Sequence, residues 1–159
     1  MPTTASHVFK PSIARCVQLD GFVPTARGAA AIAPPALAWP AKDPRDVLDY
    51  QLDISSAVAG NDGDTIGTID ISISPNMPGD LTLVSTQADG NSAVIWLANG
   101  QADTVYTVTA TIGTVNGRNV QRSVLLPVLS LSNPAVPATA LLTDDGSVIT
   151  DQNGTPVLS

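Results

Sequence analysis

Few residues in this chain have the type and spacing that enzyme chemistry requires. His7 is the only histidine and Cys16 is the only cysteine, and neither belongs to a nucleophile elbow, a phosphate-binding loop or a metal-binding cluster. His7 lies in a proline-flanked stretch, where an exposed histidine is the simpler interpretation. Cys16 lies in no definable electropositive site, which an activated thiolate would need. The sequence therefore predicts that the protein is not an enzyme.

The aspartates provide the one arrangement that could suit a metal ion. Asn61-Asp62-Gly63-Asp64 places several oxygens within four residues, and Asp43, Asp46 and Asp49 are close in sequence. Calcium binds six to eight oxygens, but the full spacing of an EF-hand loop is missing. The alternative is that Asp62-Gly63 forms a turn and that Asp43 brackets the turn at Pro44. We expect turns, no essential metal and no cofactor.

Alternating apolar and polar residues predict the strands that would position these side chains. Leu48, Tyr50, Leu52 and Ile54 share one face of a strand, and the intervening residues are polar. The same reasoning predicts strands at 47–54, 66–74, 81–87, 92–98, 104–115 and 118–128. Asn116-Gly117 is the strongest hairpin signal, because a type I′ turn needs positive φ at both central residues. Closely spaced strands without helices predict an all-β, immunoglobulin-like antiparallel sandwich.

Composition supports this fold class and excludes several functions. All 14 acidic residues are aspartate, and the chain has 12 Gly and 13 Pro, which disfavours helices. The net charge is −7 and the seven basic residues are scattered, so we expect no nucleic-acid partner. We expect the acidic surface to favour solubility or docking to a basic neighbour. No apolar run is long enough for a membrane span, so we expect no membrane partner.

The predicted core depends on which face of each strand points inward. We expect Leu48, Tyr50, Ile71, Trp96, Tyr106, Val108 and Val124 to be buried. The stretch Val94-Ile95-Trp96-Leu97 is apolar on both faces, and we expect Val94 and Trp96 to point into the core. Ile95 and Leu97 would then point away, either beneath a loop or arm or at a subunit interface.

Three regions differ in composition. Residues 1–38 read as an extended Pro- and Ala-rich arm, 39–129 as the sandwich, and 130–159 as a tail with two Asx-Gly turn units that form a β-ribbon. The arm is either disordered or ordered against a neighbouring subunit, and the tail either frays or pairs with a partner. We expect both ends to be extended on other subunits. Apolar interface candidates are Phe9, Ile13, Val17, Phe22, Trp39, Ile95, Leu97, Leu141, Leu142, Ile149 and Val157.

One segment resembles a known family. The matching residues are Lys42, Asp43, Pro44, Asp46, Leu48, Asp49, Tyr50 and Asp53, followed by Gly63–Ile66, Val94–Leu97, Tyr106–Thr109 and Asn116-Gly117-Arg118. In order and spacing they resemble the phage fiber-tail adaptor family, whose members are small β-sandwich proteins of tailed-phage virions. The resemblance runs from about Lys42 to Val128 and departs at Ile54, where an aromatic residue is expected. It implies that the Lys-Asp-Pro segment is structural and fixes how the first strand approaches the sandwich.

The resemblance implies a structural virion protein that connects tail fibers to the tail or neck by protein–protein docking. Its partners would be other virion proteins (tail fiber, tail or portal/neck adaptor subunits) and its own copies, in a symmetric multi-copy assembly. It would be located in the tail or neck region of the virion and assembled in the host bacterial cytoplasm. Two alternatives stay open: a capsid decoration or head-fiber protein, and a host-surface carbohydrate-binding module. A row of exposed aromatic residues would favour the sugar binder.

Overall fold

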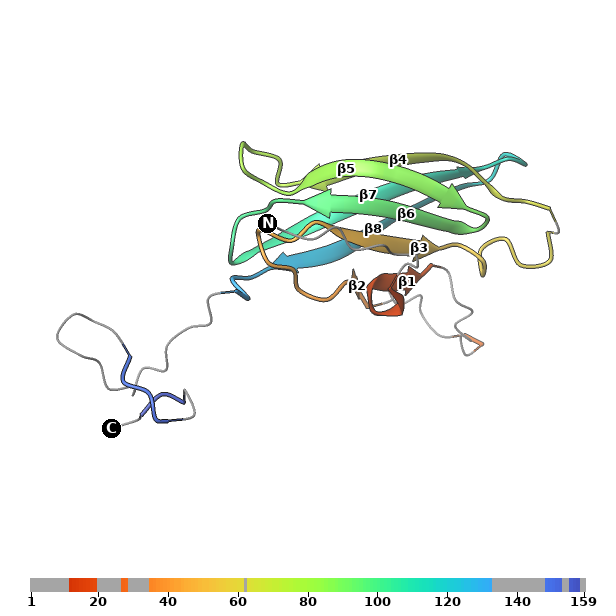
Figure 1. The fold of residues 1–159 in the computed structure, drawn as a ribbon. Coiled ribbons are helices and arrows are strands. Elements are labelled where there is room, and N and C mark those ends of the chain that lie inside the picture. The colour runs from red at the N-terminus through yellow and green to blue at the C-terminus, as the bar shows by residue number, and fades with distance from the viewer. Residues whose placement is uncertain are drawn as a thin grey trace, which may run out of the picture. The chain divides into compact units, whose positions relative to one another are not determined.

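The computed structural model describes residues 12–19, 27–28, 35–61, 63–132, 148–152 and 155–157. It is an all-β sandwich of two four-stranded sheets, which confirms the predicted fold class (Figure 1). A short 3-10 helix, η1 (Ile13–Arg15), precedes the strands. The strands are β1 (Cys16–Gln18), β2 (Leu37–Ala38), β3 (Leu48–Asp53), β4 (Ile66–Ser74), β5 (Thr82–Asp89), β6 (Ser92–Ala98), β7 (Thr104–Thr114) and β8 (Asn119–Val128).

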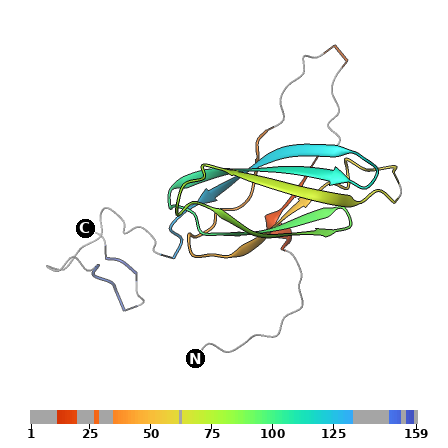
Figure 2. The same ribbon diagram turned by 90° about the horizontal axis from the view of Figure 1, so that it is seen from above.

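The two sheets lie face to face (Figure 2). The first sheet has the strand order β1-β3-β6-β5, and the second has the order β2-β8-β7-β4. All pairs among β3 to β8 are antiparallel, whereas β1 and β2 join the edges of β3 and β8 in parallel. At one end of the sandwich β3, β5 and β7 begin and β4, β6 and β8 end. We call it the Lys42 end, after the residue that links its loops.

The six strands predicted from alternation are confirmed, with ends that differ by two residues or fewer. The hairpin at Asn116-Gly117 is also present, but its predicted turn type is wrong. Gly117 has a φ of 89°, whereas Asn116 is not among the residues with positive φ. The Thr114 amide donates to the Arg118 carbonyl at 2.8 Å, which closes a three-residue loop. Loops of this length place one glycine in the left-handed region and not two residues.

Two described parts of the segment before residue 39 lie on the sandwich, namely residues 12–19 and Leu37–Ala38, and we call them the strap. Residues 12–19 cover the edge of β3, and Leu37–Ala38 cover the edge of β8. The buried side chains of Val17 and Leu19 belong to the hydrophobic core. The Arg15 guanidinium donates to the carboxylate and to the backbone carbonyl of Asp49, both at 2.7 Å. Residues 1–129 consequently form one compact unit.

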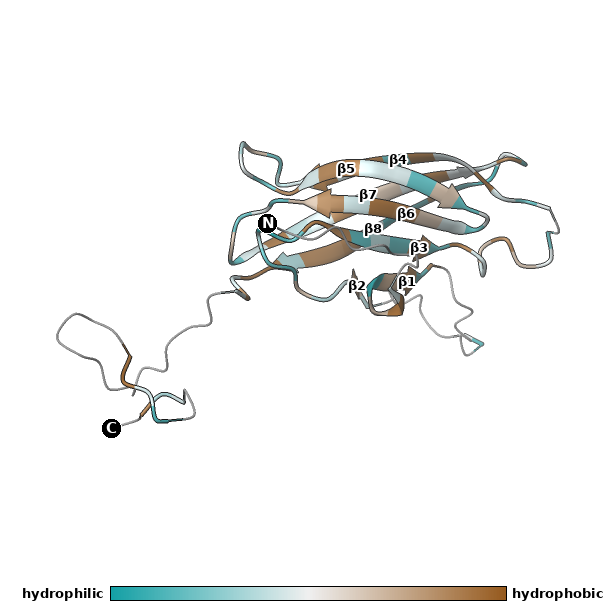
Figure 3. Cartoon of the chain, viewed as in Figure 1, coloured by the Kyte–Doolittle hydropathy of each residue, from teal (hydrophilic) through white to brown (hydrophobic). Residues whose placement is uncertain are grey.

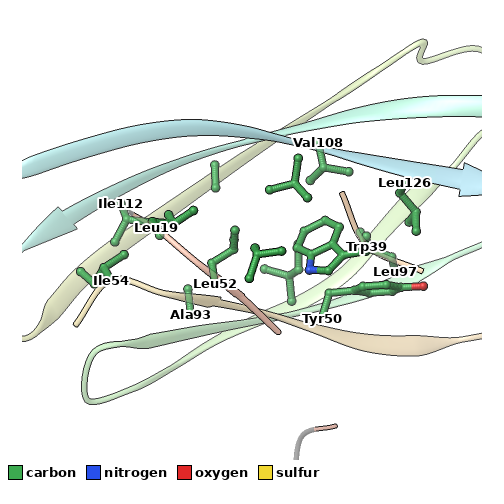
Figure 4. Close-up of a cluster of buried hydrophobic side chains, with 14 of the residues drawn as sticks. Leu19, Trp39, Tyr50, Leu52, Ile54, Ala93, Leu97, Val108, Ile112 and Leu126 are labelled. Carbon is green, nitrogen blue, oxygen red and sulfur yellow. The ribbon is translucent and has the colours of Figure 1, made fainter. Parts of the chain in front are cut away.

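The centre of the core is an aromatic pair between the sheets (Figure 4). Trp39, between β2 and β3, lies against Tyr50 of β3 with ring centroids 4.9 Å apart. Both side chains are buried. Brown, apolar residues recur along β4 and β6 in Figure 3, as expected for strands that line a core. Of the predicted core residues, Tyr50, Tyr106, Val108 and Val124 are buried, and Leu48 and Ile71 pack partly buried against the core.

The predicted inward position of Trp96 is wrong. In the β3–β6 register Tyr50 lies opposite Ile95, so these two side chains share the core face. Ile95 and Leu97 are therefore fully buried in the core, not directed outward. Trp96 is only partly buried on the opposite face, opposite Asp49. The tryptophan that fills the core is Trp39, which lies outside any strand predicted from sequence.

The second compact unit comprises Ser130–Ser159. Its described part contains an antiparallel bridge between Thr150 and Pro156. The Val157 amide donates to the Ile149 carbonyl at 2.8 Å, and the Thr155 amide donates to the Asp151 carboxylate at 2.9 Å. This turn lies in the second of the two predicted Asx-Gly units. Most of the first predicted Asx-Gly unit, residues 141–149, lies outside the described residues.

The two tryptophans should differ in their contribution to stability. Trp39→Ala removes a buried ring and should lower the free energy of unfolding by about 3–5 kcal/mol. Trp96→Ala, on a partly exposed face, should cost less than half as much. Urea denaturation monitored by far-UV circular dichroism measures both variants. Equal losses would contradict the assignment of Trp39 as the core residue.

Removal of the strap should also destabilise the sandwich. Deleting residues 1–19 exposes the sites of Val17 and Leu19 and should cost roughly 3–6 kcal/mol, at about 1.5–3 kcal/mol for each lost side chain. Deleting residues 1–11 is the matched control and should leave the melting temperature nearly unchanged. If both truncations melt like the full chain, the strap does not belong to the core.

Candidate docking surface at the Lys42 end

A buried lysine links the loops at this end of the sandwich. The Lys42 side chain is 0% exposed. Its ammonium donates to the carbonyl oxygens of Asp43 and Asn99, both at 2.7 Å. The Lys42 amide donates to the Pro127 carbonyl at 3.0 Å, and its carbonyl accepts from the Leu129 amide at 2.9 Å. Burial lowers the pKa of Lys42, and the nearby carboxylates of Asp46 and Asp43 oppose this shift.

The next residues form a tight turn that leads into β3. The Asp46 amide donates to the Asp43 carbonyl at 3.0 Å, and the Asp43 amide donates to the Asp46 carboxylate at 3.1 Å. The Asp43 carboxylate accepts from the Arg45 amide at 2.9 Å. Pro44 fixes one backbone dihedral inside the turn. These contacts set the direction in which the chain reaches Leu48.

A tyrosine fastens two further loops to the same end. The Tyr106 hydroxyl accepts from the Gln101 amide at 2.8 Å and donates to the Asp80 carboxylate at 2.7 Å. The other Asp80 oxygen accepts from the Met77 amide at 2.7 Å. A tyrosine near the start of a strand that bonds to backbone a few residues upstream is the tyrosine corner of immunoglobulin-like sandwiches. Burial raises the pKa of Tyr106, so its hydroxyl stays protonated near neutral pH.

Exposed apolar side chains gather on this firmly bonded end. Residues 1–129 contain eight large apolar side chains that the structure describes as exposed, and six of them lie here. They are Val47, Met77, Leu83, Val84, Val105 and Leu129, with exposed fractions from 39% to 69%. Ile13 and Val115 are the other two. An apolar surface on a rigid frame is typical of a protein–protein contact.

The structure places the interface residues predicted from sequence in several different environments. Val17, Trp39, Ile95 and Leu97 are buried in the core, so they cannot contact a partner, and this corrects their assignment. Ile13 is 91% exposed at the start of the strap. In the second unit Ile149 is exposed and Val157 is partly buried. Four other candidates lie outside the described residues: Phe9, Phe22, Leu141 and Leu142.

The exposed residues of the Lys42 end were not among the predicted candidates. Val105 does carry a sequence signal, because it precedes the inward-facing Tyr106 and must therefore point outward. Val47 and Met77 lie in loops and carry no periodic signal. The clustering of all six exposed residues depends on the sandwich, which brings four separate parts of the chain to one end.

The Asn61–Asp64 segment lies at the opposite end and takes part in an ion pair. The Arg118 guanidinium donates to the Asp64 carboxylate and, at 2.6 Å, to the Asn61 side-chain oxygen. The Asn116 amide donates to the second Asp64 oxygen at 3.0 Å. Asp62 itself lies outside the described residues. In the described part of the chain no group of three or more His, Cys, Asp or Glu side chains is arranged as metal ligands.

The described residues also include no helix that is both long and apolar enough to cross a membrane.

Comparison with known proteins assigns the chain to a family. The model of the family described as podophage GP4 fiber-tail adaptor protein gp77 matches residues 42–127, more than half of the chain. The chain belongs to this fiber-tail adaptor family. The adaptor family is one of structural phage proteins, which agrees with the resemblance carried by Lys42, Asp43 and Pro44. No curated protein was found to match the chain.

Among solved structures, the chain matches one described as the solution structure of the PKD domain from KIAA 1837 protein. The identity is 22%, the match covers 73% of this chain and 99% of that one, and the TM-score is 0.36.

The region shared with the adaptor family begins and ends at the Lys42 end. Its first residue, Lys42, donates its amide proton to the carbonyl of its last, Pro127. The shared region therefore closes on itself at the end that carries the exposed apolar residues.

The ion pair at the opposite end should make stability depend on pH. Burial would raise the pKa of Asp64, but hydrogen bonds from Asn116, Thr114 and Arg118 and the charge of Arg118 lower it overall. Because the pKa of Asp64 is lower in the folded state, its ionised carboxylate stabilises the protein at pH values above the ordinary carboxyl pKa of about 3.9. This stabilisation is lost as the pH falls through the lowered pKa. Asp64→Asn should therefore be less stable than wild type at pH 7, with the gap closing below about pH 4. Urea titrations from pH 7 to 2.5 test this, and a gap that stays constant would contradict it.

Proposed function

We propose that this chain joins a tail fiber to the tail of a podophage virion and that it binds its partner through the Lys42 end. The single observation that carries the docking site is the gathering of six of the eight exposed apolar side chains at that end. Membership of the fiber-tail adaptor family supports the role of the whole protein. The proposed mechanism is docking of a rigid block and involves no chemical step.

The rigidity of this end favours binding, because a surface that is already ordered loses little conformational entropy on association. The loops that carry Val47 and Met77 are fixed by hydrogen bonds at Asp43 and Asp80. Apolar side chains held in this way can pack closely against a partner. The proposed contact combines these apolar side chains with polar groups of the same loops, a mixture also found in protein–protein interfaces of other systems.

The carbohydrate-binding alternative is not supported by the aromatic residues that the structure describes. Trp39, Tyr50 and Tyr106 are buried in the core, and Trp96 is partly buried. A sugar-binding platform needs several exposed rings with polar neighbours. The capsid-decoration alternative has no specific observation in its favour, whereas the family match favours the tail.

In this proposal the partners are a fiber protein and a tail or neck protein, and the protein is located in the virion tail after assembly in the host cytoplasm. The net charge of −7 favours partner surfaces that are apolar or basic.

Two valines near the ends of β7 provide a matched test. Val105, at the Lys42 end, is 54% exposed, and Val115, at the opposite end, is 67% exposed. Val105→Asp would bury a charge in the proposed contact and should weaken docking about tenfold or more, which corresponds to about 1.4 kcal/mol. Val115→Asp introduces the same charge away from the contact and should have no effect.

The measurement is the amount of adaptor and fiber in purified particles of a phage that lacks its own copy of the gene and receives each variant from a plasmid. Thermal melts confirm that both variants fold. The proposed site is wrong if Val105→Asp enters particles and retains fibers as well as Val115→Asp does.

A further inference from the structure

The space between the two sheets is filled differently on the two sides of the sandwich. On one side Val17 and Leu19 of the strap, with Trp39 directly after it, pack into the core. The other side is formed by the edge strands β4 and β5, which lie together along it (Figure 1). How well this second side is closed depends on the side chains that these two strands direct inward.

The inward residues of β5 are small over most of its length. After the register shift that follows Leu83, Thr86 lies opposite Ile95 and Ala88 lies opposite Ala93. Ile95 and Ala93 belong to the buried core, so Thr86 and Ala88 are on the same inward face. Both are nevertheless exposed. A threonine and an alanine therefore do not close the core along this edge.

The facing strand β4 directs three isoleucines into this space. Ile69, Ile71 and Ile73 each lie opposite a buried residue of β7 and pack against the core. All three are only partly buried, whereas their partners in β7 are fully buried. The isoleucines therefore keep apolar surface in contact with water, and covering this surface would be favourable.

Where β4 ends and β5 begins, this space widens into a groove. The groove has a volume of about 460 Å³, and Ile71, Ile73, Leu81 and Leu83 form its apolar lining. A cavity of roughly 150 Å³ with a similar apolar lining is large enough to bind benzene in another protein. The groove therefore has room for the ring of an aromatic side chain together with neighbouring atoms.

The groove is continuous with the docking surface of the Lys42 end. Leu83 lines the groove and is 39% exposed, and it is one of the six residues of that surface. Asn76, which also lines the groove, directly precedes the exposed Met77. A partner that covers Met77 and Leu83 therefore reaches the opening of the groove.

The charges around the groove favour a basic occupant. From Asp46 to Gly117, a stretch that includes β4 and β5, the chain contains no lysine, arginine or histidine. Asp70 precedes the groove residues of β4 and is exposed, and Asp80 precedes those of β5 and accepts its hydrogen bonds from uncharged donors. The cations of the Lys42 end, Lys42 and Arg45, precede β3, which β6 separates from β5. A positive charge on the partner is consequently favoured beside the groove.

We propose that this groove binds an aromatic side chain, flanked by a lysine or arginine, of the virion protein that docks on the Lys42 end. The aromatic ring covers the isoleucines of β4, as the strap residues fill the core on the other side. Its basic neighbour lies in the negative field of Asp70 and Asp80. Buried aromatic anchors commonly dominate the energy of such contacts. This inference rests on the proposed function and specifies the chemistry of its partner.

Two isoleucines of β4 provide a matched pair of variants. Ile73→Thr places a hydroxyl in the groove, whereas Ile69→Thr makes the same change on the same face of β4 outside the groove lining. Threonine keeps the preference for strands, so the two variants should melt at similar temperatures. In the particle assay described above, Ile73→Thr should lower the amount of adaptor and fiber by roughly fivefold or more, and Ile69→Thr should match wild type.

Comparison with Val105→Asp separates this inference from the proposed function. If Val105→Asp loses fibers but Ile73→Thr behaves like Ile69→Thr, the Lys42 end is the docking site and the groove proposal is overturned. If Ile73→Thr loses fibers and Val105→Asp does not, the groove is supported and the contact proposed at the Lys42 end is wrong. If neither variant loses fibers, both proposals are overturned.

Binding of small peptides to the unmodified full chain tests the chemistry of the occupant and does not depend on the folding of any variant. The probes are the capped tripeptides Lys-Phe-Lys, Glu-Phe-Glu and Lys-Ala-Lys, titrated into isotope-labelled protein and followed by NMR. Lys-Phe-Lys should shift the amide signals of Ile71, Ile73 and Leu83 in a saturable way and bind at least roughly threefold more tightly than Glu-Phe-Glu. Lys-Ala-Lys should cause no saturable shift. The proposal is overturned if these amides do not respond to Lys-Phe-Lys, or if Glu-Phe-Glu or Lys-Ala-Lys binds equally well.

Discussion

The buried ammonium group of Lys42 is the constraint on which the architecture of this end depends. A charged group inside a protein is costly unless hydrogen bonds replace its lost hydration. Here the replacements are backbone carbonyls, and each must be brought to the lysine by a loop. Asn99 does so with a left-handed backbone, at a φ of 62°, which is uncommon for a residue other than glycine. The lysine thus fixes the loop between β6 and β7 as well as the turn that precedes β3.

The strap gives the sandwich two different sides. On one side β1 and β2 cover the edges of β3 and β8 for part of their length, and Val17 and Leu19 complete the core beneath them. On the other side β4 and β5 are edge strands, and β5 is exposed along its whole length. An isolated sandwich with two open sides could add strands without direction. Covering one side leaves β4 and β5 as the edge strands without a second partner among the described residues.

The sequence predicted the long strands because each has one polar and one apolar face, as the alternation from Leu48 to Asp53 shows. It could not predict β1 and β2, which have three and two residues and form only because β3 and β8 offer an edge. In β6 both faces are apolar, so periodicity alone gives no orientation, and the inward direction predicted for Trp96 is wrong. Composition could not predict that Lys42 is buried either, because lysine side chains are rarely buried. Only the family resemblance indicated that the Lys-Asp-Pro segment is structural, and the exposed apolar residues of the docking surface required the three-dimensional fold.

The proposed contact at the Lys42 end combines two kinds of interaction. Side chains such as Val105 carry it, so only a partner with a complementary shape fits it. A stretch from Asp46 to Gly117 without a cationic side chain adds a preference of charge, because it repels acidic surfaces and favours basic ones. Shape therefore selects the partner at short range, and charge selects it already during the approach.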